Sequence, residues 1–169
     1  DQFTINLPVQ GPAALFANIA SAFGVSSEAR SLYPFLANPQ GANDIQIGAF
    51  IDTIYENLFN RASDAAGQAY WTGQIRGAMA SGKFVGSVLV DIISGTQNSP
   101  AGQDITTLMG KVAVNLEYVH EQQRLGTTWS TISDAADATA LLHGVSADPR
   151  TVLVGIAQAQ NLVAADAQH

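Results

Sequence analysis

Apolar residues recur at three- and four-residue spacing along most of this chain, and this period constrains the fold more than any other feature. The spacing places the residues on one face of an α-helix, and that face must be buried against a neighbour. It predicts helices from Asn43, from Asp64, from Phe84 to Gly95, and from Asp104 to Leu125. The residues in register are Ile47, Phe50, Ile51, Ile54 and Leu58 in the first, Phe84, Val85, Val88, Leu89, Ile92 and Ile93 in the third, and Ile105, Leu108, Val112, Leu116 and Val119 in the longest.

Residues with capping chemistry mark the ends of these helices. Asn43, Asp64, Ser133 and Ser146 stand at predicted starts, where a side-chain oxygen accepts hydrogen bonds from unpaired backbone N–H groups. Gly126 follows the longest run and suits a helix end, because glycine tolerates the left-handed backbone found there. The last two helices therefore begin near Ser133 and Ser146.

The first 42 residues have a different pattern. The opening "DQFTINLPVQ" alternates apolar and polar residues and predicts an extended arm. A helix is expected from Pro12 to Gly24, followed by a short helix that bends at Pro34 and stops before Pro39. We therefore expect one all-α domain of about seven or eight helices, with residues 1–42 as arm and short helices and residues 43–169 as the helical core.

The composition restricts the possible partners. Of 169 residues, 12% are charged, with 7 basic against 14 acidic side chains. Such sparse positive charge disfavours nucleic acid as a partner, and the short apolar runs predict no membrane-spanning segment. The absence of cysteine excludes disulfides and thiolate metal sites. An acidic, Lys-poor chain rich in Ala, Thr, Asn and Gln is typical of secreted or surface proteins of bacteria, so we expect an extracellular or cell-surface location.

One segment, "YENLFNRASDAAGQAYW", resembles the recurring core of the bacterial domain of unknown function 4214. Asn60 stands where the family usually has glycine, and the resemblance extends over about residues 45–165. It implies a helical domain of large exported proteins, distantly similar to phycobilisome linker domains. A similar domain anchors some surface-layer proteins to polysaccharide, and no enzymatic activity is attached to the family. The matching positions are Tyr55, Leu58, Asn60, Arg61, Asp64, Gly67, Tyr70 and Trp71.

The residues of this motif have a structural interpretation. Asp64 is expected to cap a helix, a contribution of about 1 kcal/mol. Gly67 is expected to permit close helix approach, and Tyr70 and Trp71 to supply large buried area. Arg61 is expected to pair with Asp64 or with the carbonyl end of the preceding helix.

Candidate metal ligands are few. Asp134 and Asp137 are three residues apart on one predicted helix, with His143 farther along, and His120 is next to Glu121. The chain has neither a His-Glu-x-x-His motif nor a calcium loop with alternating acidic residues. We interpret the two aspartates as a solvated acidic first turn of a helix and His120 as exposed or hydrogen-bonded, and we expect no metal and no cofactor.

Trp129 is the best candidate for ligand contact. It lies in "LGTTWSTISD", between two predicted helices, and its neighbours Thr128 and Ser130 carry hydroxyl groups. An aromatic face beside short polar groups suits a sugar ring, although Trp129 folded back over the core is the alternative. The sequence favours a non-enzymatic binding module that recognises cell-surface polysaccharide. The alternative function is a structural subunit that packs with other protein subunits.

The first prediction concerns metal dependence. Because no cluster of ligands at metal-binding spacing is evident, thermal unfolding should be the same with and without a chelator. Circular dichroism melting curves in EDTA and in added Ca²⁺ or Zn²⁺ measure this. A fall of several degrees in EDTA contradicts the prediction and directs attention first to Asp134 and Asp137.

Overall fold

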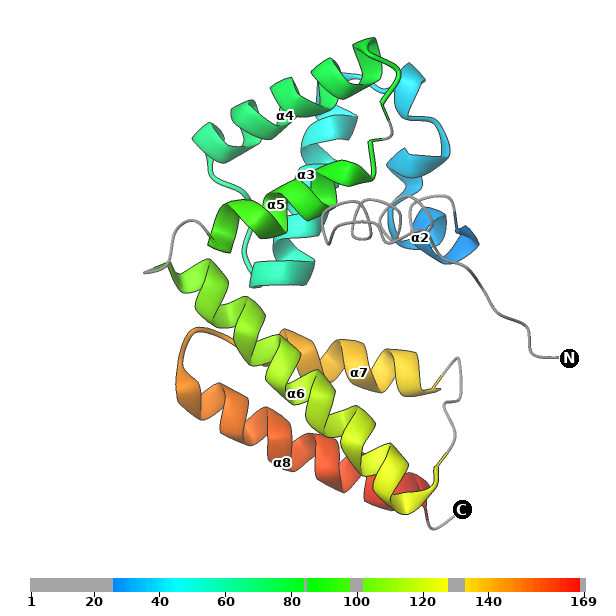
Figure 1. Ribbon diagram of the computed structural model, residues 1–169, viewed down its shortest axis with the longest axis vertical. Helices are drawn as coiled ribbons and strands as arrows, with labels where there is room; N and C mark the ends of the chain where they lie inside the picture. Colours follow the sequence, from blue (N-terminus) through cyan, green and yellow to red (C-terminus); the bar gives the residue numbers. More distant parts are fainter. Residues whose placement is uncertain (1–25, 84, 98–101, 128–132, 168–169) are drawn as a thin grey trace, which may run out of the picture. The chain divides into compact units, whose positions relative to one another are not determined.

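A computed structural model describes residues 26–83, 85–97, 102–127 and 133–167. The described part is all-α and contains no strand, which confirms the predicted fold class (Figure 1). None of its helices is both long and apolar enough to span a membrane. The helices are α2 (Ser27–Leu32), α3 (Asp44–Phe59), α4 (Ala65–Ala80), α5 (Ser87–Gln97), α6 (Gln103–Leu125), α7 (Ser133–His143) and α8 (Pro149–Asp166), with the 3-10 turns η1 (Pro34–Ala37) and η2 (Pro39–Gly41).

The chain divides into two compact units. Unit 1 comprises the residues up to Ile54 together with Ser63–Gly95, and unit 2 comprises Tyr55–Ala62 together with the residues from Thr96 onward. The last turn of α3 is therefore grouped with unit 2. The expectation of a single domain divided at residue 42 stays a prediction.

Helix ends follow the predicted capping residues closely. Asn43 and Gln46 form a reciprocal capping box at the start of α3, with both backbone-to-side-chain distances at 2.9 Å. Gly126 ends α6 in the left-handed conformation, with φ 70°. The start of α8 differs from expectation, because Asp148, not Ser146, is its N-cap and accepts from the Arg150 N–H at 3.0 Å.

In unit 1, α4 lies across α3 (Figure 1), and polar side chains link the two helices. Arg76 on α4 binds Asp44 on α3 through Nη2 at 2.7 Å, near one end of the pair. Asp52 accepts from the Gln68 amide at 3.2 Å, near the other end. These contacts fix the register of the two helices. The buried apolar side chains of unit 1 that lie on α3, α4 and α5 are Ile47, Phe50, Ile51, Ile54, Ile75, Met79, Val88 and Ile92.

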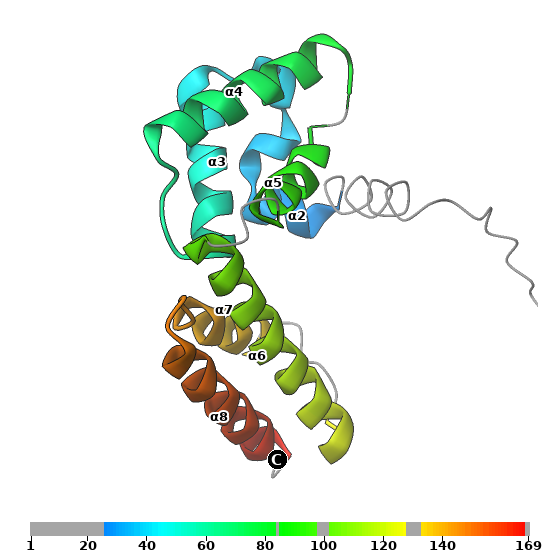
Figure 2. The same ribbon diagram turned by 60° about the vertical axis from the view of Figure 1, so that its left-hand side comes forward.

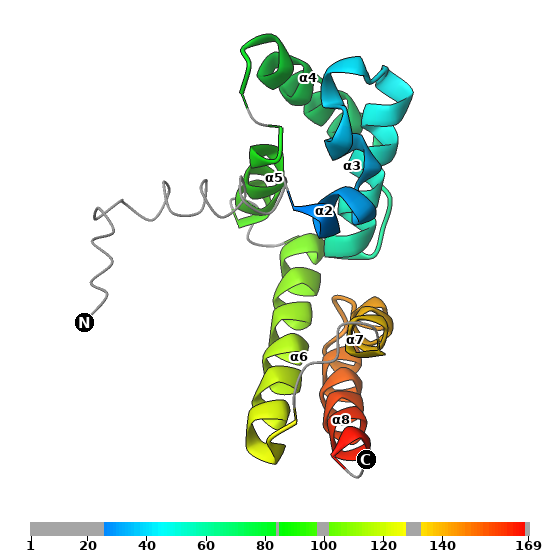
Figure 3. The same cartoon turned by 90° about the vertical axis from the view of Figure 1, so that its right-hand side faces the viewer.

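Unit 2 contains α6 and α8, which run side by side in the same direction, and α7 (Figure 2). Figure 3 shows α7 next to the N-terminal part of α8. The side-chain amide of Gln160 on α8 donates to Glu117 on α6 at 2.7 Å, which fits the parallel direction. The core of unit 2 consists of Val114, Tyr118, Leu141, Val145, Ala159 and Val163.

Two glycines allow α6 and α8 to approach closely. A Cβ on Gly110 would stand 2.8 Å from Val152 Cγ2, and a Cβ on Gly155 would stand 2.8 Å from Val114 Cγ2. Real Cβ atoms essentially never approach a neighbour so closely. The close packing of α6 against α8 therefore depends on glycine, which has no side chain, at both positions.

The buried face of α6 is not the one that its apolar period suggests. Val112, Leu116 and Val119 were expected to be in register with the core, but they are exposed together with Met109. The reason lies on α8, whose small residues Gly155 and Ala159 accept a different face of α6. That buried face includes polar groups and consists of Thr107, Gly110, Lys111, Val114, Tyr118 and Glu121.

A polar cluster around Asn60, which we call the Asn60 cluster, holds the parts of unit 2 together. Asn60 has φ 56°, in the left-handed region that glycine, asparagine and aspartate adopt most readily. This conformation explains why asparagine can replace the usual glycine of the motif. Its Nδ2 lies 2.5 Å from the Val145 carbonyl, 3.0 Å from that of His143 and 3.3 Å from that of Leu142. The side chain thus satisfies carbonyl groups where α7 ends.

Lys111 completes the Asn60 cluster from α6. Its Nζ donates to Asn60 Oδ1 at 2.6 Å and to the Asn57 carbonyl at 2.7 Å, near the C-terminus of α3. The side chain is only 6% exposed. Burial disfavours the charged amine and lowers the pKa of Lys111 to about 8, although Glu56 partly opposes the shift. The carbonyl end of α3 and the two hydrogen bonds offset part of this cost.

The second prediction concerns pH. The pKa of Lys111 falls from an ordinary value of 10.5 to about 8 in the folded protein. Between these values the unfolded chain retains a proton that the folded chain has released, so the free energy of unfolding should rise with pH across this window. We expect a rise on the order of 1 to 3 kcal/mol, measured by urea unfolding at several pH values. In Lys111→Met the rise should disappear, and an equal rise in that variant contradicts the assignment.

Candidate functional site

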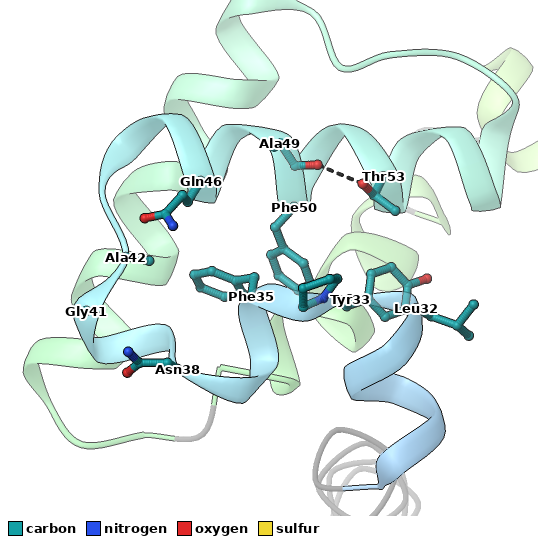
Figure 4. Close-up of a pocket in the computed structure, with 11 residues that line it drawn as sticks. Leu32, Tyr33, Phe35, Asn38, Gly41, Ala42, Gln46, Ala49, Phe50 and Thr53 are labelled. Atoms are coloured by element: carbon teal, nitrogen blue, oxygen red, sulfur yellow. Dashed lines mark hydrogen bonds between the residues drawn. The ribbon is translucent and has the colours of Figure 1, made fainter.

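A pocket of unit 1 lies between α2, the two 3-10 turns and α3. Its volume is about 350 Å³. Pro34 and Pro39 start the successive 3-10 turns, and these turns lead the chain around one side of the pocket. The opposite side is the N-terminal part of α3 (Figure 4). The lining residues are Leu32, Tyr33, Pro34, Phe35, Asn38, Gly41, Ala42, Gln46, Ala49, Phe50 and Thr53.

Three aromatic rings contribute to the apolar part of the pocket. The Phe35 and Phe50 rings are stacked, with centroids 4.5 Å apart and planes at 27°. Tyr33 meets Phe50 edge to face at 5.6 Å. Phe50 and Tyr33 are buried, whereas Phe35 is partly exposed. Phe35 therefore presents the aromatic surface that a ligand can reach.

The polar side chains that line the pocket carry amide and hydroxyl groups and no charge. Figure 4 shows Asn38 and Gln46 at the end of the pocket next to Phe35. Gln46 Oε1 is used by the capping box with Asn43, whereas the Asn38 side chain makes no hydrogen bond within the described residues. No lining residue carries a carboxylate, an imidazole, an ammonium or a guanidinium group. The pocket thus suits an uncharged ligand with one apolar face and a polar edge.

The motif residues of unit 1 differ in their exposure. Asp64 caps α4 and accepts from the Gly67 N–H at 2.8 Å, which confirms its predicted role. The Tyr70 and Trp71 rings meet edge to face at 4.9 Å. Tyr70 is 58% exposed, so the expectation that it supplies buried area is wrong. Consecutive helical residues point about 100° apart, and Trp71 is the one that turns toward Gly95 of α5.

The motif residues of unit 2 form an ion pair and an aromatic contact. Arg61 donates to both carboxylate oxygens of Asp104, at 2.8 and 2.7 Å. The sequence had indicated Asp64 or the carbonyl end of the preceding helix as its partner, and not Asp104. Its guanidinium carbon lies 5.0 Å from the centre of the Tyr55 ring. Tyr55 is buried and meets Phe59 edge to face at 5.2 Å. These contacts support a structural role for Tyr55 and Arg61 at the end of α3.

The predicted ligand contacts Thr128, Trp129 and Ser130 lie outside the described residues. The role of Trp129 therefore stays a prediction. Of the metal candidates, Asp137 lies on α7 beside a shallow hollow with Leu141 and Leu162. The exposed His143 is at the end of the same helix.

Within the described residues, Glu117, His120 and Glu121 form a group whose ligand atoms lie within 4.8 Å of one another. Arg124 donates to Glu121 at 2.8 Å and holds the pKa of that carboxyl below its usual range. Glu117 accepts from Gln160. A cation at this position would lie beside the Arg124 guanidinium, so the group is better described as an ion-pair network.

The sequence did not reveal the pocket, and it indicated His120 and Glu121 but not that Glu117 joins them. One wall of the pocket comes from "SLYPFLANPQG", where the two prolines indicated bends but not that Tyr33 and Phe35 would meet Phe50 of α3. The Glu-x-x-His-Glu spacing from residue 117 to residue 121 was a visible signal for the second group, because residues three and four apart share a helix face.

Part of the chain matches a known protein family. Residues 20–85 match the family model of a domain of unknown function, DUF4214, which confirms the resemblance within that segment. The expected extension to residue 165 stays a prediction. No curated protein and no solved structure matches the chain significantly. All lining residues of the unit 1 pocket lie within the matched segment.

The third prediction tests the cap of α4. Asp64→Ala removes the acceptor for the Gly67 N–H and should lower the free energy of unfolding by about 1 kcal/mol. Asp64→Asn is the matched control, since its side-chain oxygen can still accept, and it should lose much less. Urea unfolding followed by circular dichroism measures both. Equal losses in the two variants would mean that the charge, and not the cap, is what stabilises α4.

Proposed function

We propose that this chain is a non-enzymatic binding module of an exported or cell-surface bacterial protein. Its ligand is a neutral sugar unit of a glycan or surface polymer, bound in the unit 1 pocket. The observation that carries the proposal is the uncharged, aromatic lining of a pocket of about 350 Å³. Small-ligand sites combine such apolar walls with a few placed polar groups.

The chemistry of the lining favours a sugar over a charged ligand. A sugar ring has an apolar face that can lie on Phe35 and hydroxyl groups that can bond to the Asn38 amide. A phosphate or carboxylate ligand would need a cationic partner, and the lining has none. The lack of acid–base groups in the lining favours binding over catalysis.

The setting is proposed on sequence grounds. The acidic, Lys-poor composition and the resemblance to domains of exported proteins both favour an extracellular or cell-surface location. The same resemblance favours surface polysaccharide as the source of the glycan.

The fourth prediction tests the pocket directly. Phe35→Ala and Asn38→Ala should each weaken binding of neutral surface-polysaccharide oligosaccharides about tenfold, which corresponds to about 1.4 kcal/mol. Isothermal titration calorimetry measures the affinity, and thermal melting confirms that the variants are folded. Tyr70→Ala is the control, because it removes an exposed aromatic ring that does not line the pocket.

The same titration with Trp129→Ala distinguishes the two candidate contacts. Loss of binding in Trp129→Ala, with no change in Phe35→Ala and Asn38→Ala, overturns the pocket and supports the loop. No binding by the wild-type chain to any neutral oligosaccharide tested contradicts glycan recognition itself.

A second candidate function, a structural subunit of a larger protein assembly, is favoured by a different observation. Four apolar side chains on one face of α6 are exposed within the chain. This face is separate from the pocket residues and does not depend on the glycan proposal.

A further inference from the structure

The exposed apolar residues of α6 form one continuous line, which we call the α6 stripe. It consists of Met109, Val112, Leu116 and Val119, whose exposed fractions range from 39% to 62%. Single exposed apolar residues are common on protein surfaces, but a contiguous row along a helix indicates an interaction site. The partly polar core face of α6 packs against α8, and the stripe is a separate, exposed apolar face of the same helix.

The spacing of the α6 stripe fits a partner helix. The steps are three, four and three residues, which is the heptad pattern of a coiled-coil seam. At 100° per residue the stripe lies almost opposite the buried face that contains Val114 and Tyr118. A narrow seam of this kind accommodates one helix and not a broad sheet.

The positions that flank the stripe carry no carboxylate, ammonium or guanidinium. They are occupied by Leu108, Ala113, Asn115, His120 and Gln122. Flanking charges normally set the partner and orientation of paired helices, and a basic partner would require acidic flanks. The chain as a whole has a net charge of -7, so a contact between two copies is least opposed by repulsion where it lies on an uncharged surface. The α6 stripe is such a surface.

We propose that the α6 stripe pairs with the same stripe of a second copy, with the two α6 helices antiparallel. Large and small side chains alternate along it, as Met, Val, Leu and Val. An antiparallel two-fold pairing places Met109 opposite Val119 of the other copy, and Leu116 opposite Val112. Each layer then combines one large and one small side chain, and the contact closes on itself.

A parallel pairing would pack like against like. It would place Leu116 against Leu116 and Val112 against Val112, so that the layers alternate between crowded and sparse. The stripe is also short, because the ten steps from Met109 to Val119 span about 15 Å. It is smaller than a standard interface of about 800 Å² on each partner, so we expect weak, concentration-dependent association.

Sedimentation equilibrium of the full chain, from about 1 μM to about 1 mM, tests the pairing. The wild type should shift from monomer to dimer over this range, and Leu116→Glu should remain monomeric. The control is Leu153→Glu, which alters an apolar residue of α8 that is 68% exposed and lies off the stripe. A wild type that stays monomeric throughout, or a Leu153→Glu variant that loses the dimer equally, overturns the proposal.

Thermal melting of the monomers separates pairing from covering within one chain. Leu116→Glu should melt at the same temperature as the wild type at low concentration, because the residue is exposed in the single chain. A fall of several degrees would mean that another part of the same chain covers the stripe, and would overturn the proposal.

Cysteine cross-linking tests the orientation, since the chain has no cysteine of its own. A mixture of Val112→Cys and Leu116→Cys should form the mixed disulfide faster than either variant couples to itself, because these positions face each other only in the antiparallel pair. Faster self-coupling of each variant indicates a parallel pair and overturns the proposed orientation.

Discussion

Unit 2 depends on the hydrogen bonds of one side chain, that of Asn60. Its left-handed backbone ends α3, its amide nitrogen faces the carbonyl groups that follow α7, and its amide oxygen accepts from Lys111 on α6. Helix ends leave carbonyl groups without intrahelical partners, and burial of such groups without compensation is costly. Asn60 meets this requirement at the end of α7, and the Lys111 amine that it accepts from meets it at the end of α3 by donating to the Asn57 carbonyl. Glycine could adopt the same backbone conformation, but it would leave the Lys111 amine and the α7 carbonyls without this partner.

The Asn60 cluster also accounts for the unusual surface of α6. Since Lys111 must reach Asn60, the face of α6 that carries Lys111 is turned inward, and Gly110 on the same face allows α8 to approach. The stripe from Met109 to Val119 is consequently turned outward. A helix that packs in its own unit through a partly polar face can still offer an apolar seam to another helix. The exposed stripe is therefore a result of how unit 2 packs internally.

The two proposed interactions use different units and different physical chemistry. The unit 1 pocket offers a partly open aromatic surface with amide groups at one end and no formal charge, which suits selective recognition of a small neutral group. The α6 stripe offers a narrow, exposed apolar line, which suits repetition of the same contact between copies. Weak self-association of a ligand-binding module would increase its effective affinity for a polymer with repeated units, because the second binding event becomes intramolecular.

Local chemistry in the sequence determined where the helices begin and end. Asn43, Asp64 and Gly126 act within a few residues of their own position, so their roles could be predicted without knowledge of the fold. The family motif was likewise recognisable from residue types and spacing alone. The unit 1 pocket could not be predicted, because Phe35 and Phe50 meet only after the 3-10 turns reverse the chain.

Only the tertiary structure decided which faces are buried. The spacing of apolar residues shows that a helix has an apolar face. It does not show which neighbouring element covers that face or at what crossing angle. On α6 the small residues of α8 and the reach of Lys111 selected a partly polar face over the more apolar one. The sequence showed that Leu116 belongs to a set of apolar residues at helical spacing and that Lys111 carries an amine. Their burial was decided by packing, because burial depends on contacts between residues that are far apart in the chain.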